Sequence, residues 1–169
     1  MLTDNLFPSF PDHARVWVYQ ANRKFTAEEM ESILIRGSHF IRDWNTHGAS
    51  VSGDMDEILG CFVVIVANEQ EQMVSGCAID RTVSLIKEIE QLTNANLFDR
   101  FSVAIYKDDA ILPMTMDAFM KGVKAGEFDG NTKVFNNTIT TLKQLRHEWI
   151  VEVKNSWHSR FADTKQLSF

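Results

Sequence analysis

The segment 61–67 (CFVVIVA) constrains the fold more than any other part of the chain, because it contains no polar side chain. Its β-branched and aromatic residues favour a strand, and the lack of polar alternation is typical of a strand buried on both faces. Residues 15–20 (RVWVYQ) predict a second strand, also apolar on both faces at its centre. A sheet built on these two strands needs a covering layer on each face.

The clearest helix signal follows the first of these strands. Thr26 and Glu29 form a capping box, and apolar residues recur at helical spacing from Met30 to Trp44. We expect this helix to end at Gly48. The other expected elements are an edge strand at 49–59, a helix from Ser75 to 94–96, a strand at 101–106 and a short strand at 111–112.

The C-terminal third predicts two further helices. Thr115 is expected to cap one, and Asn136 with Asn137 to cap the other. The chain is then expected to run extended over 151–161. Residues 1–14 are interpreted as an extended arm, residues 15–161 as a single domain and residues 162–169 as a tail.

The order β-α-β-β-α-β predicts an α+β fold with a ferredoxin-like core and a C-terminal helical addition. In that core the first and third strands are central, which suits the two doubly apolar segments. The second face of the sheet is expected to be covered by the C-terminal helices and tail, or by the sheet of a second subunit in a homodimer. If 49–59 is only a loop, the alternative is a three-layer α/β fold.

Composition excludes several classes of function. The 169 residues carry 17 basic and 23 acidic side chains, for a net charge of −6, which disfavours nucleic-acid and anionic-membrane partners. No apolar run approaches the roughly 20 residues of a membrane helix, and the first residues lack signal-peptide character, so a cytoplasmic location is expected. Two cysteines and five histidines show no metal spacing, and neither a metal nor a cofactor is expected.

Cys77 lies where a helix is expected to begin, next to Gly76 and one turn before Asp80. Unpaired N–H groups and the helix dipole stabilise a thiolate at such a position, and Asp80 is a candidate ligand-binding residue. The alternative is structural: Cys77 packs as a small apolar residue and Asp80 caps the helix. Cys61, within the apolar strand, is interpreted as a core residue.

A second candidate cluster is formed by Trp157, His158 and Arg160 near the end of the chain. In an extended segment His158 and Arg160 share one face. His158 is a candidate base for Cys77, while Arg160 and Trp157 are candidate ligand-binding residues. The alternative is a tail anchored by its aromatic rings.

Arg23 and Lys24 lie between the first strand and the first helix. Strand-to-helix loops often hold ligands, and these two cations are candidates for binding a small anion at the helix start. The alternative interpretation is a solvated turn.

Four segments carry a resemblance to a known family: 17–25 (WVYQANRKF), 76–80 (GCAID), 134–137 (VFNN) and 156–161 (SWHSRF). Together they resemble a family of short, uncharacterised bacterial proteins often labelled "ABC transporter ATPase". The resemblance covers nearly the whole chain in order and spacing. It implies no functional residues, because none is established for the family.

The residues contradict the ATPase label. ATP hydrolysis by that class needs a glycine-rich loop that binds phosphate through backbone N–H groups, followed by Lys and Ser or Thr. The nearest stretch, residues 126–133 (GEFDGNTK), has acidic residues where phosphate would lie.

Two hypotheses of function therefore remain. The first is a non-enzymatic domain that binds a small ligand or another protein. The second is a thiol-dependent enzyme or redox-responsive protein that uses Cys77, with His158 as its base.

Overall fold

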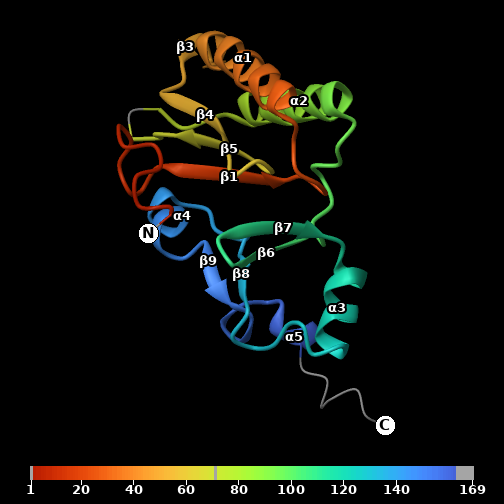
Figure 1. Ribbon diagram of the computed structural model, residues 1–169. Coiled ribbons are helices and arrows are strands. Elements are labelled where there is room, and N and C mark those ends of the chain that lie inside the picture. The colour runs from red at the N-terminus through yellow and green to blue at the C-terminus, as the bar shows by residue number, and fades with distance from the viewer. Residues whose placement is uncertain (1, 71, 163–169) are drawn as a thin grey trace.

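The structure, a computed structural model, describes residues 2–70 and 72–162. Its elements stack in four layers (Figure 1). Helices α1 (Ala27–Asp43) and α2 (Gly76–Thr93) cover one face of a first sheet. A second sheet lies against the other face, and helices α3 (Met116–Lys124) and α5 (Ser159–Ala162) lie beyond it.

The first sheet is antiparallel, with the order β1-β5-β4. Its strands are β1 (Arg15–Gln20), β4 (Gly53–Ile58) and β5 (Phe62–Ala67). All six residues of β5 have an exposed fraction of zero, so the prediction of a strand buried on both faces is confirmed. The prediction for β1 was wrong in one respect, because β1 forms an edge of its sheet and is not central.

The second sheet is also antiparallel, with the order β7-β6-β8-β9. Its strands are β6 (Val103–Lys107), β7 (Ala110–Met114), β8 (Lys133–Phe135) and β9 (Ile150–Glu152). β6 corresponds to the strand expected at 101–106. A ferredoxin-like sheet would place it beside β1, but here it pairs with β7 and β8. The α+β class is therefore confirmed, whereas the ferredoxin-like topology is not.

The second sheet supplies the cover that the first sheet needs. The ring of Phe62 on β5 lies 4.8 Å from the ring of Phe135 and 4.7 Å from that of Trp149, measured between centroids. On the other face of the second sheet, Val103 and Ile105 of β6 pack with Phe119 of α3 in a smaller core. Both faces of β5 are thus covered within one chain. The homodimer stays a prediction, but a second subunit is no longer needed to cover this sheet.

Helix α1 begins as predicted and ends earlier. The Thr26–Glu29 capping box is present, but the last helical residue is Asp43. Trp44 turns into the core, where its exposed fraction is 1% and its Nε1–H donates to the Ala78 carbonyl at 3.0 Å. The following residues form the hairpin of β2 (Asn45–Thr46) and β3 (Ala49–Ser50). Gly48 therefore belongs to the hairpin turn and does not end the helix.

Two C-terminal predictions were also wrong. Helix α4 (Leu142–His147) is capped by Thr141, which forms a capping box with Gln144, so Asn136 and Asn137 do not cap it. The segment expected to be extended over 151–161 leaves β9 through a 3-10 turn, η1 (Val153–Asn155), and enters α5. In both places a local hydrogen-bonded turn forms where the apolar spacing alone indicated another structure.

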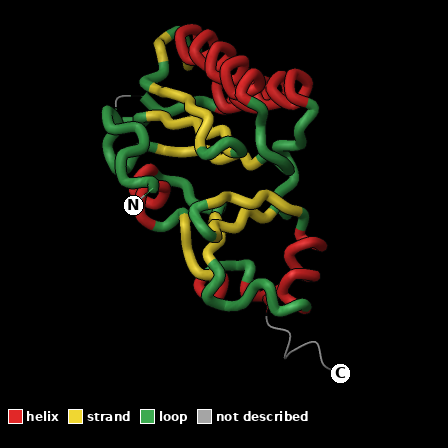
Figure 2. The backbone as a smooth tube through the Cα atoms, in the orientation of Figure 1, coloured by secondary structure: helices red, strands yellow, loops and turns green. Residues whose placement is uncertain are grey.

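The N-terminal arm folds back onto α4 and is drawn as loop in Figure 2. Arg146 of α4 donates to the carbonyls of Leu6 and Phe7 and pairs with Asp12 at 2.7 Å. Phe7 is buried in the main core. Residues 163–169, most of the predicted tail, lie outside the described residues.

Candidate ligand-binding site

Cys77 and His158 lie in different layers of the molecule. Cys77 is exposed in the first turn of α2, on the outer helical layer. His158 is fully buried just before α5, at the opposite end of the stack (Figure 1). Because both sheets lie between them, His158 does not serve as a base for Cys77 in this structure. The thiol-enzyme hypothesis loses the residue pairing on which it depended.

The surroundings of His158 explain its burial. Its ring stacks on that of Trp157 at 3.9 Å and contacts the edge of Phe119. The Ser156 hydroxyl donates to the Val153 carbonyl at 3.1 Å, so it accepts from Nδ1–H of His158 at 2.9 Å. Nε2 is then an unpaired acceptor with no partner among the described residues. Burial lowers the pKa of His158 to about 4, which keeps the ring neutral near pH 7.

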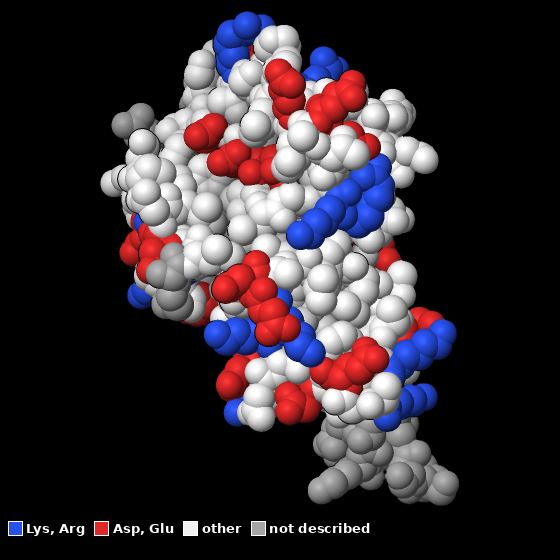
Figure 3. Space-filling model, viewed as in Figure 1, with Lys and Arg blue, Asp and Glu red and all other residues white. Residues whose placement is uncertain are grey.

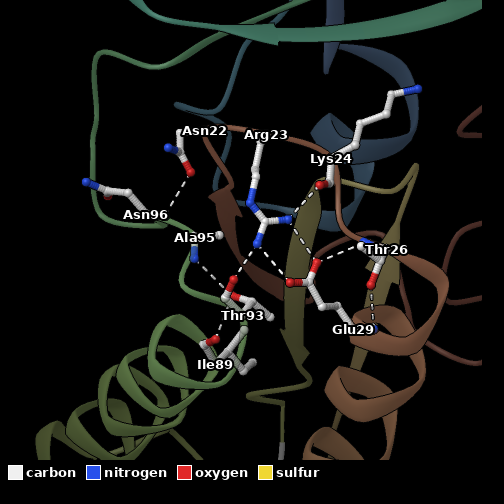
Figure 4. Close-up of polar contacts among 9 residues, drawn as sticks. All are labelled: Asn22, Arg23, Lys24, Thr26, Glu29, Ile89, Thr93, Ala95 and Asn96. Carbon is white, nitrogen blue, oxygen red and sulfur yellow. Dashed lines mark hydrogen bonds and ion pairs between the residues drawn. The ribbon is translucent and has the colours of Figure 1, made fainter.

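Arg23 is committed to structural contacts (Figure 4). Its guanidinium donates to both carboxylate oxygens of Glu29, at 2.9 Å and 2.8 Å, and to the carbonyl of Thr93 at the end of α2. The hydrogen bonds from Arg23, together with one from the Thr26 N–H, lower the pKa of Glu29 to about 2. Arg23 thus joins the starting turn of α1 to the last turn of α2, which favours the structural interpretation of this loop.

The other predicted polar residues lie apart from one another. Lys24 is exposed in the β1–α1 loop, Asp80 is exposed on α2, and Arg160 is exposed on α5. Arg160 therefore does not share a face with buried His158, as an extended segment would have required.

A pocket of about 530 Å³ opens along β1, and Trp157 lines it. The rest of the lining comprises all six residues of β1, Val83 of α2, parts of the segment 97–102 that follows α2, and residues 137–140 before α4. This volume falls in the usual range for small-molecule sites, roughly 300–1,000 Å³. Trp157 is thus the one predicted ligand-binding residue that lines it.

One wall of the pocket is the outer edge of β1. The Ala21 N–H donates to the Cys61 carbonyl beside β5, whereas the Val16 N–H points the other way and donates to the Thr140 carbonyl at 2.9 Å. Backbone groups alternate along a strand, so the N–H and C=O groups of Val18 and Gln20 also point away from β5. Among the described residues, neither N–H has a hydrogen-bond acceptor.

The side chain of Gln20 presents a second unused donor. Its orientation follows from Trp149, whose Nε1–H can only donate and does so to Oδ1 of Asn137 at 2.8 Å. Nδ2 of Asn137 must therefore donate to Oε1 of Gln20, at 2.7 Å. The remaining Gln20 atom, Nε2, is a buried donor without an acceptor in the described structure, on a residue that is 5% exposed.

Aromatic and charged side chains form the remaining walls. The rings of Tyr19 and Phe98 meet edge to face at 5.8 Å, and burial raises the pKa of Tyr19, so its phenol stays neutral. The Arg15 guanidinium lies 4.6 Å from the centre of the Trp17 ring. Arg100 brings a further positive charge to the pocket. The site offers donors, cations and flat apolar surfaces together.

The lining residues lack the groups of the common nucleophilic mechanisms. Neither a cysteine nor a histidine is among them, and the Ser102 hydroxyl contacts only the Asp99 carboxylate, at 3.3 Å.

Within residues 2–70 and 72–162, no group of three or more His, Cys, Asp or Glu side chains could hold a metal ion. No helix in the described part of the chain is long and apolar enough to cross a membrane. On the face seen in Figure 3, acidic and basic side chains are interspersed.

The loop at 126–133 binds a carboxylate of its own. It connects α3 to β8, and its Asn131 and Thr132 N–H groups donate to Oδ1 of Asp129 at 2.9 Å and 3.0 Å. In a phosphate-binding loop, such N–H groups face the phosphate. These two N–H groups are therefore used within the loop, and the expectation that the chain does not hydrolyse ATP stays a prediction.

No family model, characterised protein or solved structure matches the chain. The resemblance to the family labelled "ABC transporter ATPase" therefore stays a prediction. Sequence reasoning missed the rest of the lining, including Gln20 and Asn137. A buried glutamine in an otherwise apolar strand was the available signal for the first.

Proposed function

We propose that the chain is a non-enzymatic binding domain whose ligand occupies the pocket along β1. The observation that carries this proposal is the unpaired Nε2 of Gln20. A buried donor without a partner costs about 1–3 kcal/mol, and a ligand oxygen placed against it would recover that cost. Gln20 also lines the pocket, so its unsatisfied Nε2 is the group that a ligand oxygen bound there would satisfy.

The surrounding residues narrow the class of ligand. Nε2 of Gln20 and the N–H groups of Val18 and Gln20 are donors, so the ligand needs carbonyl or carboxylate oxygens. Trp157 and Phe98 offer aromatic surfaces, which favour an apolar or aromatic group beside those oxygens. Arg100 adds a preference for negative charge. The lining contains neither a cysteine nor a histidine, which supports binding without chemical conversion.

Side-chain NMR tests this proposal directly. Isotope-labelled protein is titrated with a panel of small aromatic carboxylates and amides, and the Gln20 NH₂ and Trp157 indole resonances are followed. We expect both to shift with the same ligands. If no resonance of a lining residue responds to any member of the panel, the proposal is wrong.

Gln20→Glu is the informative variant. It keeps an oxygen that accepts from Asn137, but it replaces the unpaired donor with an oxygen. We expect carboxylate ligands to bind at least about tenfold more weakly, the effect of losing one charge-assisted hydrogen bond. Gln91→Glu, on the exposed surface of α2, makes the same change of charge and serves as the control. Equal binding by both variants would remove Gln20 from the site.

A further inference from the structure

The two edges of the first sheet differ in how they are protected. Edge strands usually carry charged residues, prolines or bulges that prevent another strand from pairing with them. β4, at one edge, contains Asp54, Asp56 and Glu57. β1, at the other edge, has the sequence RVWVYQ, with no charge after its first residue. The unprotected edge is the one that the pocket follows.

Part of this edge already accepts a strand-like partner. Arg15 and Thr141 form an isolated antiparallel bridge, and the Val16 N–H donates to Thr140. Beyond that point the segment leaves the edge, and Asn137 reaches Gln20 only through its side chain. The outward groups of Val18 and Gln20 continue the same antiparallel pattern without a backbone partner among the described residues.

The segment beside this edge exposes large apolar side chains. Phe98, which lines the pocket, is 39% exposed, and Phe101 in the same loop is 63% exposed. Exposed apolar residues gathered beside a groove mark a surface for a protein partner more often than one for a small polar metabolite.

We propose that the ligand is an extended peptide segment that adds to β1 as an antiparallel strand. This inference rests on the function proposed above and names its ligand. The backbone groups of Val18 and Gln20 would pair with the peptide backbone, and Nε2 of Gln20 would donate to a peptide oxygen. Alternate apolar side chains of the peptide would contact Phe98 and Trp157. Arg15 already pairs with Glu69 at 3.6 Å, so Arg100 is the lining cation that favours a peptide with a carboxylate.

Selection from a random peptide library provides the probe. Peptides of about eight residues, which span the unpaired stretch from Val18 to Gln20 with flanking residues on each side, are selected against the full chain, and their dissociation constants are measured. Val18→Pro removes one outward N–H without removing a hydrogen bond between β1 and β5. Val18→Thr keeps both that N–H and the side-chain shape. We expect selected peptides to bind Val18→Pro about tenfold more weakly and Val18→Thr nearly as well as the original chain.

Methylated peptides test the same pairing on the unmodified protein, should Val18→Pro fail to fold. Methyl groups on alternate backbone nitrogens block either the edge that faces β1 or the edge that faces away. We expect one of the two methylation registers to abolish binding and the other to preserve it. Equal binding in both registers would overturn strand addition.

Three further results would each overturn the inference. One is a library that yields no binding peptide. Another is binding of small aromatic carboxylates to the pocket without any binding of peptides. That result would overturn strand addition but leave the proposed function intact. The third is a dimer of the free chain, seen by sedimentation, that dissociates when Val18 is replaced by proline. The edge of β1 would then be occupied by a second copy of the chain. If neither small ligands nor peptides bind, the proposed function fails as well.

Discussion

At the scale of single residues, Asn137 shows how one side chain can satisfy groups from distant parts of the chain. It accepts from Trp149 and donates to Gln20, which lies 117 positions away. Both partners are buried, so neither can turn to water if Asn137 is removed. The site beside β1 and the contact between the two sheets thus depend on the same amide.

Replacing Asn137 with alanine should destabilise the protein by about 2 kcal/mol, because it leaves one buried donor and one buried acceptor unpaired. Urea unfolding followed by tryptophan fluorescence measures this change. Asn136→Ala is the matched control, since its side chain contacts only neighbouring Thr138 and should cost about 0.5 kcal/mol or less. Similar losses for both variants would contradict the assigned role of Asn137.

The two cysteines should differ sharply in their reaction with alkylating agents. Cys77 is exposed, whereas Cys61 has no exposed surface and burial raises its pKa to about 12. We expect N-ethylmaleimide to add a single group to the native protein, at Cys77, and a second group only after unfolding, as mass spectrometry can show. Cys77→Ser should take up none in the native state. Rapid native labelling of Cys61 would contradict its placement in the core.

The sequence supported only part of the candidate site. Trp157 was predicted as a ligand-binding residue and lines the pocket, because an aromatic side chain beside polar residues is a local signal. The pairing of Gln20 with Asn137 has no local signal, since it depends on how two distant segments meet. The predicted pairing of Cys77 with His158 failed for the same reason.

At the scale of elements, the starts of α1, α2 and α3 were predictable because they depend on neighbouring residues. Thr26, Ser75 and Thr115 each accept the hydrogen bond expected of an N-cap. The second sheet was not predictable in this way. β8 has three residues, too few to display a period, and the choice of β6 between two sheets is made by long-range packing.

Two helical glycines should respond in opposite ways to alanine. A Cβ on Gly122 of α3 would lie 2.3 Å from the ring of Phe128, which is stacked on Phe119. A Cβ on Gly76 of α2 would meet no atom within 4 Å. We expect Gly122→Ala to destabilise the protein by about 1–3 kcal/mol through overpacking, and Gly76→Ala to be neutral or stabilising by up to about 1 kcal/mol. Thermal unfolding of both variants measures the difference, and a stabilising Gly122→Ala would contradict the packing of α3.

At the scale of the whole molecule, partly buried Glu57 and fully buried His158 respond to acid in opposite directions. Burial raises the pKa of Glu57, beneath the helical layer, from 4.5 to about 7. Its contribution to stability is therefore greatest below pH 4.5 and is lost as the pH rises to 7. The pKa of His158 is lowered from 6.5 to about 4. Its contribution is complete above pH 6.5 and is lost as the pH falls to 4.

Because the two pH ranges overlap, the effects of Glu57 and His158 on the free energy of unfolding should partly cancel in the unmodified chain. Glu57→Gln should raise the free energy of unfolding at pH 7.5 by about 1 kcal/mol, after allowance for solvent screening, and make its decline in acid steeper. His158→Phe should remove an acid-induced loss of about 2–3 kcal/mol between pH 6.5 and 4. Urea unfolding across this range measures both slopes. Parallel slopes for the two variants would contradict the assignment.

The N-terminal arm has a consequence for how the chain is made. Its residues are synthesised before the rest of the fold described here, yet the arginine that binds their carbonyls, Arg146, lies 140 positions after Leu6. At about 5–20 residues per second on the ribosome, the arm and the outer edge of β1 wait many seconds for their partners. During that time the first sheet can form only with α1 and α2. The nascent chain therefore presents β1 uncovered, and chaperones that hold extended apolar segments have a defined interval in which to bind it.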